Sequence, residues 1–336
     1  MTNPVLVEVT RGNLVESVHR GAIAIADASG ALKLALGDVT SPVYSRSSLK
    51  PMQAIPLIES GAAEAFGLGD EDVALACASH SGEPMHTERV ETWLRRIGLS
   101  ESDLACGAHP SRYEPVAEAM IRARLKPTRV FNNCSGKHTG FLTLARHWDV
   151  ATEGYERVDH PVQQAVAAAL KDLTGAKELQ YGIDGCAAPN FATSLTEFAT
   201  AAARMATPGA LPQPRAAATA RIIGAMIKHP ELMSGTGRAC AILIRACGGR
   251  AAVKTGAEGF FGAWLPAKGL GVAIKIDDGA ARASETAMAA VLDQLGLLGD
   301  DSKARAILRA PVLNTRGATV GERRPAIALA RFSIAQ

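Results

Sequence analysis

The sequence predicts an α/β fold of the α+β kind, with an antiparallel sheet flanked by helices. Two observations favour it. Short apolar runs typical of strands lie near both chain ends, at 5–9, 22–26, 32–36, 251–253 and 271–276. The alanine-rich middle instead carries apolar residues at helical spacing. The N- and C-terminal segments are therefore expected to build one sheet, and the middle of the chain a helical region.

Length and composition indicate what kind of protein this is and how many domains it has. The chain has 336 residues, of which 47% are hydrophobic and 21% charged, as in an ordinary globular protein. We expect a single domain over 1–336, with a sheet region at about 1–50 and 238–336 and a mainly helical region at about 51–237.

Charge and hydropathy exclude several partners. The net charge of +3 comes from 36 basic and 33 acidic residues without a basic block, which argues against nucleic-acid binding. No apolar stretch approaches a membrane span, and the N-terminus lacks the apolar core of a signal peptide. A cytoplasmic location is expected, with the six cysteines present as thiols.

The first half of the chain predicts a meander followed by helices. The strands at 5–9, 22–26 and 32–36 are separated by turn residues, and the last two form a hairpin around Ser29-Gly30. A helix over 52–66 follows, with a kink at Pro56. Another helix is expected at 87–97.

The second half predicts more helices and then the returning strands. Helices are expected at 161–173, 191–205, 216–227, 240–246 and 281–295, with a proline-rich connector at 207–214. The strand opening at 251–253 carries Lys254-Thr255-Gly256, and 271–276 forms a second strand.

A hydroxyl and an amine lie three residues apart where a helix is expected to begin. Ser47 and Lys50 would share one helix face, and Pro51 suits the first turn. This pattern favours a nucleophilic serine whose proton a lysine accepts. By itself, so short a pattern also fits a capped helix with a solvated lysine.

Three further stretches place reactive side chains at the ends of predicted elements. Ser79-His80-Ser81 follows an apolar run, and Cys134-Ser135-Gly136-Lys137-His138 enters a helix. Asp184-Gly185-Cys186 follows a short strand. Polar residues at such ends often belong to sites, although serine and glycine there also make ordinary turns.

Taken together, these motifs resemble a known enzyme family. Ser-x-x-Lys at a helix start with Lys-Thr-Gly on a late strand is similar to the serine β-lactamase and penicillin-binding fold, without its Ser-Asp-Asn motif. The five stretches 45–51, 77–83, 133–138, 184–186 and 254–259 together resemble the zinc-binding L-asparaginases of rhizobial type. The resemblance covers most of the chain and implies a β-lactamase-like fold and a homodimer.

The resemblance also implies roles for individual residues. Two serine–lysine tandems fall on Ser47 with Lys50 and on Ser79 with Lys254. A zinc ion (Zn2+) would be bound by Cys134, Lys137, Cys186 and water. Thiolates suit zinc, and a spacing of three lets Cys134 and Lys137 face one ion, although buried structural thiols beside a surface lysine remain the alternative.

The expected reaction is hydrolysis of L-asparagine to aspartate and ammonia. Ser47 attacks the side-chain amide and Lys50 accepts its proton, while Ser79 and Lys254 relay protons or stabilise charge. Candidate substrate-binding residues are Arg46, His80, Lys137, His138 and Asp184. Arg46 suits the α-carboxylate and Asp184 the α-ammonium, although the two could instead form a structural ion pair.

Glutamine, one methylene longer, would be distinguished by only about 1–3 kcal/mol, which leaves room for residual glutaminase activity.

Three alternatives remain open. A penicillin-recognising hydrolase would hydrolyse a chromogenic cephalosporin. A cysteine amidase using Cys134 and His138 would tolerate Ser47→Ala. A non-catalytic zinc or amino-acid binding protein would bind asparagine without releasing ammonia.

Overall fold

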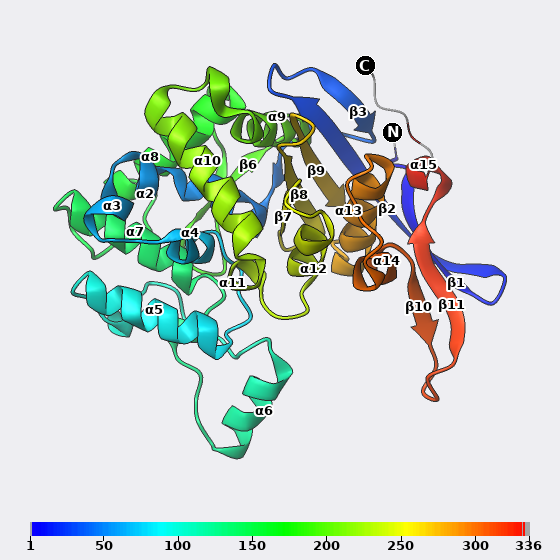
Figure 1. The fold of residues 1–336 in the computed structure, drawn as a ribbon, viewed down its shortest axis with the longest axis horizontal. Helices are drawn as coiled ribbons and strands as arrows, with labels where there is room; N and C mark the ends of the chain where they lie inside the picture. Colours follow the sequence, from blue (N-terminus) through cyan, green and yellow to red (C-terminus); the bar gives the residue numbers. More distant parts are fainter. Residues whose placement is uncertain (1, 331, 333–336) are drawn as a thin grey trace. The chain divides into compact units, whose positions relative to one another are not determined.

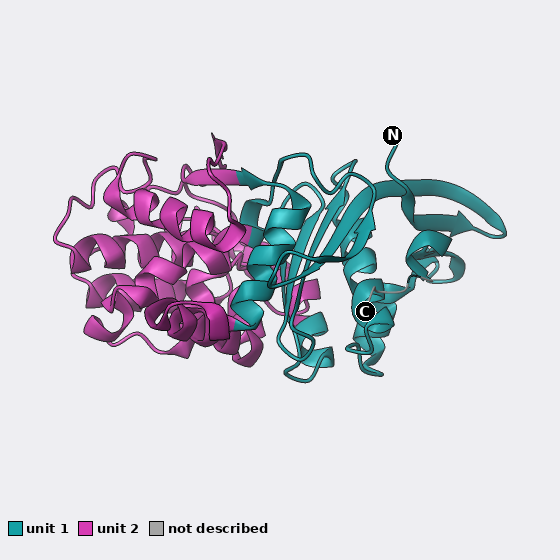
Figure 2. Cartoon of the chain, turned by 90° about the horizontal axis from the view of Figure 1, so that it is seen from above, with its two compact units in different colours: residues 1–48, 192–207, 242–336 teal, residues 49–191, 208–241 magenta. Residues whose placement is uncertain are grey.

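The structure, a computed structural model, describes residues 2–330 and 332 (Figure 1). The remaining residues of the expected domain lie outside this description. The chain divides into two compact units, coloured separately in Figure 2. Unit 1 comprises the residues up to Ser48, Ala192–Thr207 and the residues from Ile242 onward, whereas unit 2 comprises Leu49–Phe191 and Pro208–Ala241.

Unit 1 is built around an antiparallel sheet from both ends of the chain. Its strand order is β10-β11-β1-β2-β9-β8-β7, and β3 also pairs with β2. The strands are β1 (Val5–Arg11), β2 (Leu14–Asp27), β3 (Leu32–Leu36), β7 (Ala252–Thr255), β8 (Phe260–Leu265), β9 (Leu270–Ile276), β10 (Ala310–Leu313) and β11 (Thr319–Pro325). This sheet confirms the predicted fold class.

Helices cover both faces of this sheet, which is why β8 is buried along its whole length (Figure 2). The helix α9 (Leu195–Ala206) packs on β2, β8 and β9, and α13 (Ala281–Gln294) packs on β1, β8, β9 and β11. The approach of α9 is close: a Cβ at Gly271 would lie 2.0 Å from the Ala199 oxygen. The smaller α14 (Ser302–Leu308) and α15 (Ile327–Ala330) pack on α13.

Unit 2 is mainly helical. Its helices are α1 (Lys50–Gln53), α2 (Ile55–Glu59), α3 (Ala62–Ala65), α4 (Asp70–Ala76), α5 (Pro84–Arg96), α6 (Glu114–Arg122), α7 (Ser135–His147), α8 (Pro161–Thr174), α10 (Gln213–Lys228) and α11 (Pro230–Ser234). The core helix is α7, whose residues are buried from Ser135 to Ala145. It lies close to α4, since a Cβ at Gly136 would lie 2.3 Å from the Leu75 oxygen.

Two short elements, β6 (Pro189–Thr193) and α12 (Ala239–Ala246), contain a boundary between the two units. The strand β6 pairs with β5 (Tyr181–Ile183) in unit 2 and, through its last residues, with β4 (Val43–Tyr44) in unit 1. The helix α12 contains the later boundary.

The structure corrects two helix predictions. The helix expected over 52–66 is three short helices, because Pro56 cannot donate a backbone hydrogen bond and Gly61, at φ 82°, adopts the left-handed conformation that ends α2. The helix expected from 191 begins at Leu195. Phe191 instead pairs with Tyr181, and Ser194 caps α9 by accepting a hydrogen bond from the Glu197 amide at 3.1 Å.

Within residues 2–330 and 332, no helix has both the length and the apolar character that spanning a membrane requires.

Candidate active site

In unit 1, the segment carrying Ser47 lies beside the strand carrying Lys254. Ser47 is half-buried in the 3-10 helix Arg46–Leu49. The neighbouring Ser48 Oγ donates to the Lys254 oxygen at 2.6 Å. A Cβ at Gly256 would lie only 2.4 Å from the Ser45 oxygen, so glycine permits this approach. The strand that carries the Lys-Thr-Gly motif therefore packs against the segment that carries Ser47.

Lys254 itself is fully buried in β7. Its Nζ donates to the Thr255 oxygen at 3.0 Å. A lysine is almost never fully buried unless its amine is paired, and the Thr255 oxygen supplies a partner here.

Several residues next to the predicted site have a strained backbone conformation with positive φ. Five non-glycine residues in the described part of the chain have positive φ, and three of them adjoin these motifs: Arg46 (50°), Ala187 (73°) and Glu258 (57°). Such conformations are costly for residues with a Cβ and concentrate at functional sites. The strain at Arg46, directly before Ser47, supports a functional role for that turn.

In unit 2, Lys50 is buried among four acceptors. It opens α1, with Pro51 in the first turn as predicted, and is 2% exposed. Its Nζ contacts the Ala78 oxygen (2.5 Å), Ser79 Oγ (3.0 Å), Cys134 Sγ (3.1 Å) and the Asn133 oxygen (3.4 Å). None of these four groups is a carboxylate. The amine therefore connects the Ser79 hydroxyl to a thiol, a contact that the sequence did not predict.

The predicted metal ligands Cys134, Lys137 and Cys186 come together in unit 2. Cys134 is the N-cap of α7 and Lys137 lies in its first turn, so the helix begins where the spacing required. Cys186 lies in the turn between β5 and β6, which closes with an Asp184–Ala188 backbone hydrogen bond of 2.9 Å. Lys137 Nζ donates to Cys186 Sγ at 3.1 Å. All three side chains are buried.

The two thiols are electrostatically different. The interaction with Cys134, together with the Lys137 charge, lowers the pKa of Cys186 to about 4 despite its burial. The interaction with Cys186, together with burial, raises the pKa of Cys134 to about 12. Burial disfavours the Lys137 ammonium, but the Cys186 thiolate outweighs it and raises the pKa of Lys137. Of the two thiols, Cys186 is therefore the more acidic.

This donor set fits a zinc ion once Lys137 has lost a proton, because only the neutral amine has a lone pair that can bind a metal. Among the described residues, no group of three His, Cys, Asp or Glu side chains could hold a metal, so a site here would depend on Lys137 as the third protein ligand. Zinc bonds of about 2.0–2.3 Å in tetrahedral geometry separate ligand atoms by roughly 3.5 Å. The Lys137–Cys186 distance of 3.1 Å is within a few tenths of an ångström of that separation.

The predicted substrate-binding residues of unit 2 have different surroundings. His80 uses both ring nitrogens, since Nε2 lies 2.9 Å from Ser135 Oγ and Nδ1 accepts from the Gly82 amide at 3.1 Å. Burial lowers the pKa of His80 well below its usual value. Asp184 is half-buried and accepts from the Gly185 amide at 2.6 Å. Its charge also acts on Lys137.

His138 is fully buried in α7. Its Nδ1 lies 2.6 Å from Tyr155 Oη, and burial together with the Lys137 charge lowers the pKa of His138 to about 3. Sequence reasoning did not identify Tyr155, because the tyrosine lies 17 residues away with no motif connecting the two.

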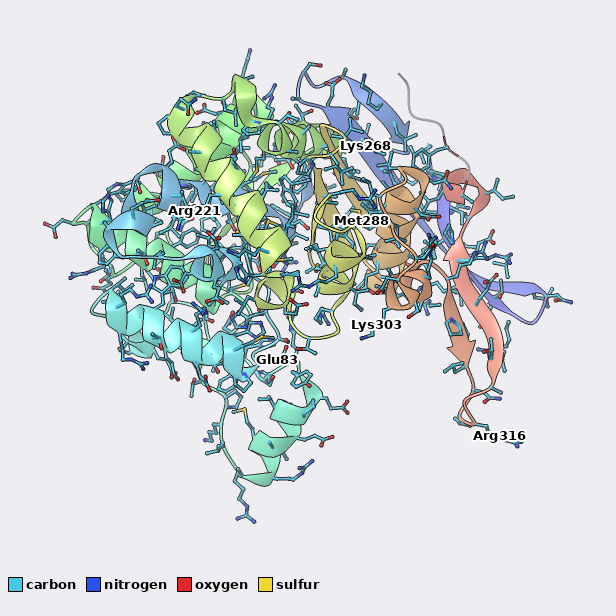
Figure 3. All side chains as sticks on the ribbon, viewed as in Figure 1. Glu83, Arg221, Lys268, Met288, Lys303 and Arg316 are labelled. Atoms are coloured by element: carbon cyan, nitrogen blue, oxygen red, sulfur yellow. The ribbon has the colours of Figure 1, made fainter. Side chains whose placement is uncertain are left out.

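A buried carboxylate that the sequence did not single out holds the Ser79 turn. Glu83, labelled in Figure 3, accepts hydrogen bonds from Ser81 Oγ (2.5 Å), the Thr236 amide (2.8 Å) and Thr236 Oγ1 (2.6 Å). The Ser79 amide donates to the Met233 oxygen at 3.1 Å. Burial would raise the pKa of Glu83, but these donors outweigh it and lower the pKa. The network fastens residues 233–236 to the turn carrying Ser79.

Glu83→Gln is expected to lower the free energy of unfolding by about 1–3 kcal/mol at pH 7, because charge-assisted hydrogen bonds to a buried group are lost. The folded-state pKa lies below the unfolded value, so this stabilisation is present above about pH 4.5 and disappears as the pH falls through the folded value. Urea denaturation at pH 7 and pH 3 measures both effects. The exposed Glu88→Gln on α5 is the control, and equal stabilities of wild type and Glu83→Gln at pH 7 would contradict the prediction.

Comparisons with known proteins identify a matching family and several distantly similar structures. The sequence model described as L-asparaginase II matches residues 7–325. No curated protein matches the chain. Among solved structures, Mglu in its native form is 15% identical with a TM-score of 0.47, the alignment covering 89% of this chain and 70% of Mglu.

Two β-lactamase structures are similar at the same level. One from Mycobacterium bovis is 13% identical with a TM-score of 0.42, covering 83% of this chain and 95% of that one. A putative one from Bacteroides dorei is 13% identical with a TM-score of 0.42, covering 76% and 84%. These similarities are distant, and the fold described above is defined by the chain's own sheet and helices.

Proposed function

The chain belongs to the L-asparaginase II family, and we propose that it hydrolyses the side-chain amide of L-asparagine through a serine acyl-enzyme with a nearby zinc site. Family membership supports an L-asparaginase enzyme and asparagine as substrate. The observation that carries the mechanism is the buried Lys50 amine, which contacts Ser79 Oγ at 3.0 Å and Cys134 Sγ at 3.1 Å.

In the proposed reaction Ser47 Oγ attacks the amide carbon and Lys50, as the neutral amine, accepts the serine proton. Ammonia leaves, and water then hydrolyses the aspartyl ester. Ser47 belongs to unit 1 and Lys50 to unit 2, so their pairing rests on their spacing of three residues in the sequence. The strained turn at Arg46 supports Ser47 as the nucleophile.

Ser79 is assigned to proton transfer to the leaving amine, and Lys254 to stabilising negative charge. The contact between Lys50 Nζ and Ser79 Oγ gives the abstracted proton a route to Ser79, from which it can pass to the leaving amine. Lys254, buried beside the segment carrying Ser47, would stabilise negative charge at the reacting carbonyl.

A free amino acid also needs partners for its charged ends. We assign the α-carboxylate to Arg46, with His80, Lys137 and His138 as further candidate contacts, and the α-ammonium to Asp184. Half-burial of Asp184 beside the thiol cluster is compatible with an exchangeable ionic partner.

Cys134, Lys137, Cys186 and water are proposed to hold a zinc ion, which would supply positive charge beside the substrate and not the nucleophile. We expect purified wild type to contain about one zinc per chain by elemental analysis, and Cys186→Ser to lose about tenfold or more in zinc affinity because the thiolate is removed. The buried Cys247→Ser, remote in sequence from these ligands, is the matched control. Full zinc content in Cys186→Ser would contradict this assignment.

The motif set supports the rhizobial zinc-binding subfamily within the broader family, and with it a cytoplasmic homodimer. Sedimentation of the purified protein tests the assembly. A monomer at micromolar concentration would remove that part of the proposal.

The test of function is ammonia release from L-asparagine and L-glutamine, measured with zinc added and with zinc chelated. We expect asparagine to be hydrolysed, with glutamine weaker by roughly 10-fold or more because of its extra methylene. Turnover of a chromogenic cephalosporin would favour a penicillin-recognising hydrolase. Binding of asparagine without ammonia release would favour the non-catalytic alternative.

A further inference from the structure

Among the described residues, one ring nitrogen of His138 has no hydrogen-bond partner. His138 lies one turn after Cys134 on α7, and its amide donates to the Cys134 oxygen at 3.0 Å. Side chains four residues apart share a helix face, so the imidazole lies on the face that carries the candidate site. Nδ1 is 2.6 Å from Tyr155 Oη. Within the part of the chain that the structure describes, Nε2 is one of the few buried side-chain atoms without a partner.

Tyr155 is itself held in place by the backbone. The side chain is 1% exposed, and its Oη accepts a hydrogen bond from the Ala105 amide at 2.9 Å. The tyrosine ring meets the imidazole edge-on with centroids 5.5 Å apart, and Phe141 does so at 6.0 Å. Packing on two sides therefore fixes the orientation of the His138 ring as well as its hydrogen bond.

Counting hydrogens decides between the two neutral forms of the ring. If Nδ1 carried the hydrogen, Tyr155 Oη would accept from both Ala105 and His138, leaving the tyrosine hydrogen and the Nε2 lone pair both unpaired in the protein interior. If Nε2 carries it, the tyrosine donates to Nδ1 and a single group, the Nε2 hydrogen, is left for another molecule. Buried polar groups are rarely left unsatisfied, so the second form is favoured.

We propose that Tyr155 is a positioning residue, which fixes His138 in the form whose Nε2–H is a hydrogen-bond donor to an oxygen of the bound amino acid. The identity of that ligand rests on the proposed function, whereas the form of the ring does not. Preorganisation of this kind avoids reorienting a buried ring when the substrate arrives.

Nitrogen-15 NMR of protein labelled at its eight histidines tests the form of the ring directly. The His138 signals are assigned by their absence in His138→Gln. We expect the wild type to show a protonated Nε2 and an unprotonated, hydrogen-bonded Nδ1, and the Nε2 signal to shift when L-aspartate is added. In Tyr155→Phe the Nδ1 shift should change and both neutral forms should appear. A protonated Nδ1 in the wild type, or an Nε2 signal insensitive to aspartate, would overturn the inference.

Kinetics separate positioning from simple stability. Tyr155→Phe should raise KM for asparagine about fivefold, with kcat within a factor of two. The reason is that the hydrogen bond from His138 Nε2 to the substrate is weakened, and this bond contributes to binding. Tyr181→Phe, at a tyrosine that is 46% exposed, is the matched control and should change neither. Unchanged KM in Tyr155→Phe would count against the inference. Absence of any ammonia release together with the expected NMR pattern would overturn the proposed function but support the Tyr155–His138 arrangement.

Discussion

Lys50→Met is expected to lower kcat for asparagine by about 10³-fold while the protein remains folded, because it removes the proposed general base but keeps an unbranched side chain of similar volume. In the native protein the amine contacts Ala78, Ser79 and Cys134. The variant leaves the Ala78 oxygen without this donor, which costs about 1–3 kcal/mol of stability. Ammonia release and thermal unfolding, measured on the same preparation, separate the two effects.

The control for Lys50→Met is Lys275→Met in β9. Lys275 is partly buried, and its Nζ also donates to a backbone oxygen, that of Ile276 at 2.5 Å. It has no place in the proposed chemistry, so kcat should stay within about twofold. If Lys50→Met retained wild-type kcat, Lys50 would be a structural amine and another group would have to accept the serine proton.

The positions of Cys134 and Lys137 at the start of α7, and the helix start at Lys50, were predictable because local rules govern them. A helix that begins at Ser135 necessarily turns Cys134 and Lys137 toward the same side. Pro51 suits the first turn of the helix that begins at Lys50, because an amide N–H there would have no intrahelical partner. The family resemblance then joined these segments to Cys186, which no local pattern could have connected to them.

Contacts between segments distant in sequence were not predictable. Nothing in the motifs showed that Lys50 would contact Ser79, 29 residues away, or that Glu83 would bind Thr236, 153 residues away. Strand β8 was missed because Phe260–Leu265 is buried on both faces and lacks the alternation that identifies a strand. The start of α9 was misplaced because pairing of Phe191 in the β5–β6 hairpin overrides its helical spacing.

Ser47→Ala is expected to reduce kcat on the order of 10⁴-fold or more, whereas Ser79→Ala should reduce it by only about 10²-fold. Removing a nucleophile eliminates the acyl-enzyme, but removing a relay leaves water to carry the proton less efficiently. Acid quenching during turnover, followed by peptide mass spectrometry, should find the aspartyl ester on Ser47 in wild type and in Ser79→Ala.

The contact between Lys50 and Ser79 makes this comparison decisive, since the same amine could serve either serine. An ester found on Ser79, with Ser47→Ala the milder variant, would reverse the roles of the two serines and make Lys254 the group to test next. Ser284→Ala is the control, because Ser284 is a buried serine of unit 1 whose Oγ donates within its own helix, to the Ala281 oxygen at 3.0 Å. Its kcat should equal that of the wild type, so a loss there would indicate sensitivity of unit 1 to any buried hydroxyl and not a role in the reaction.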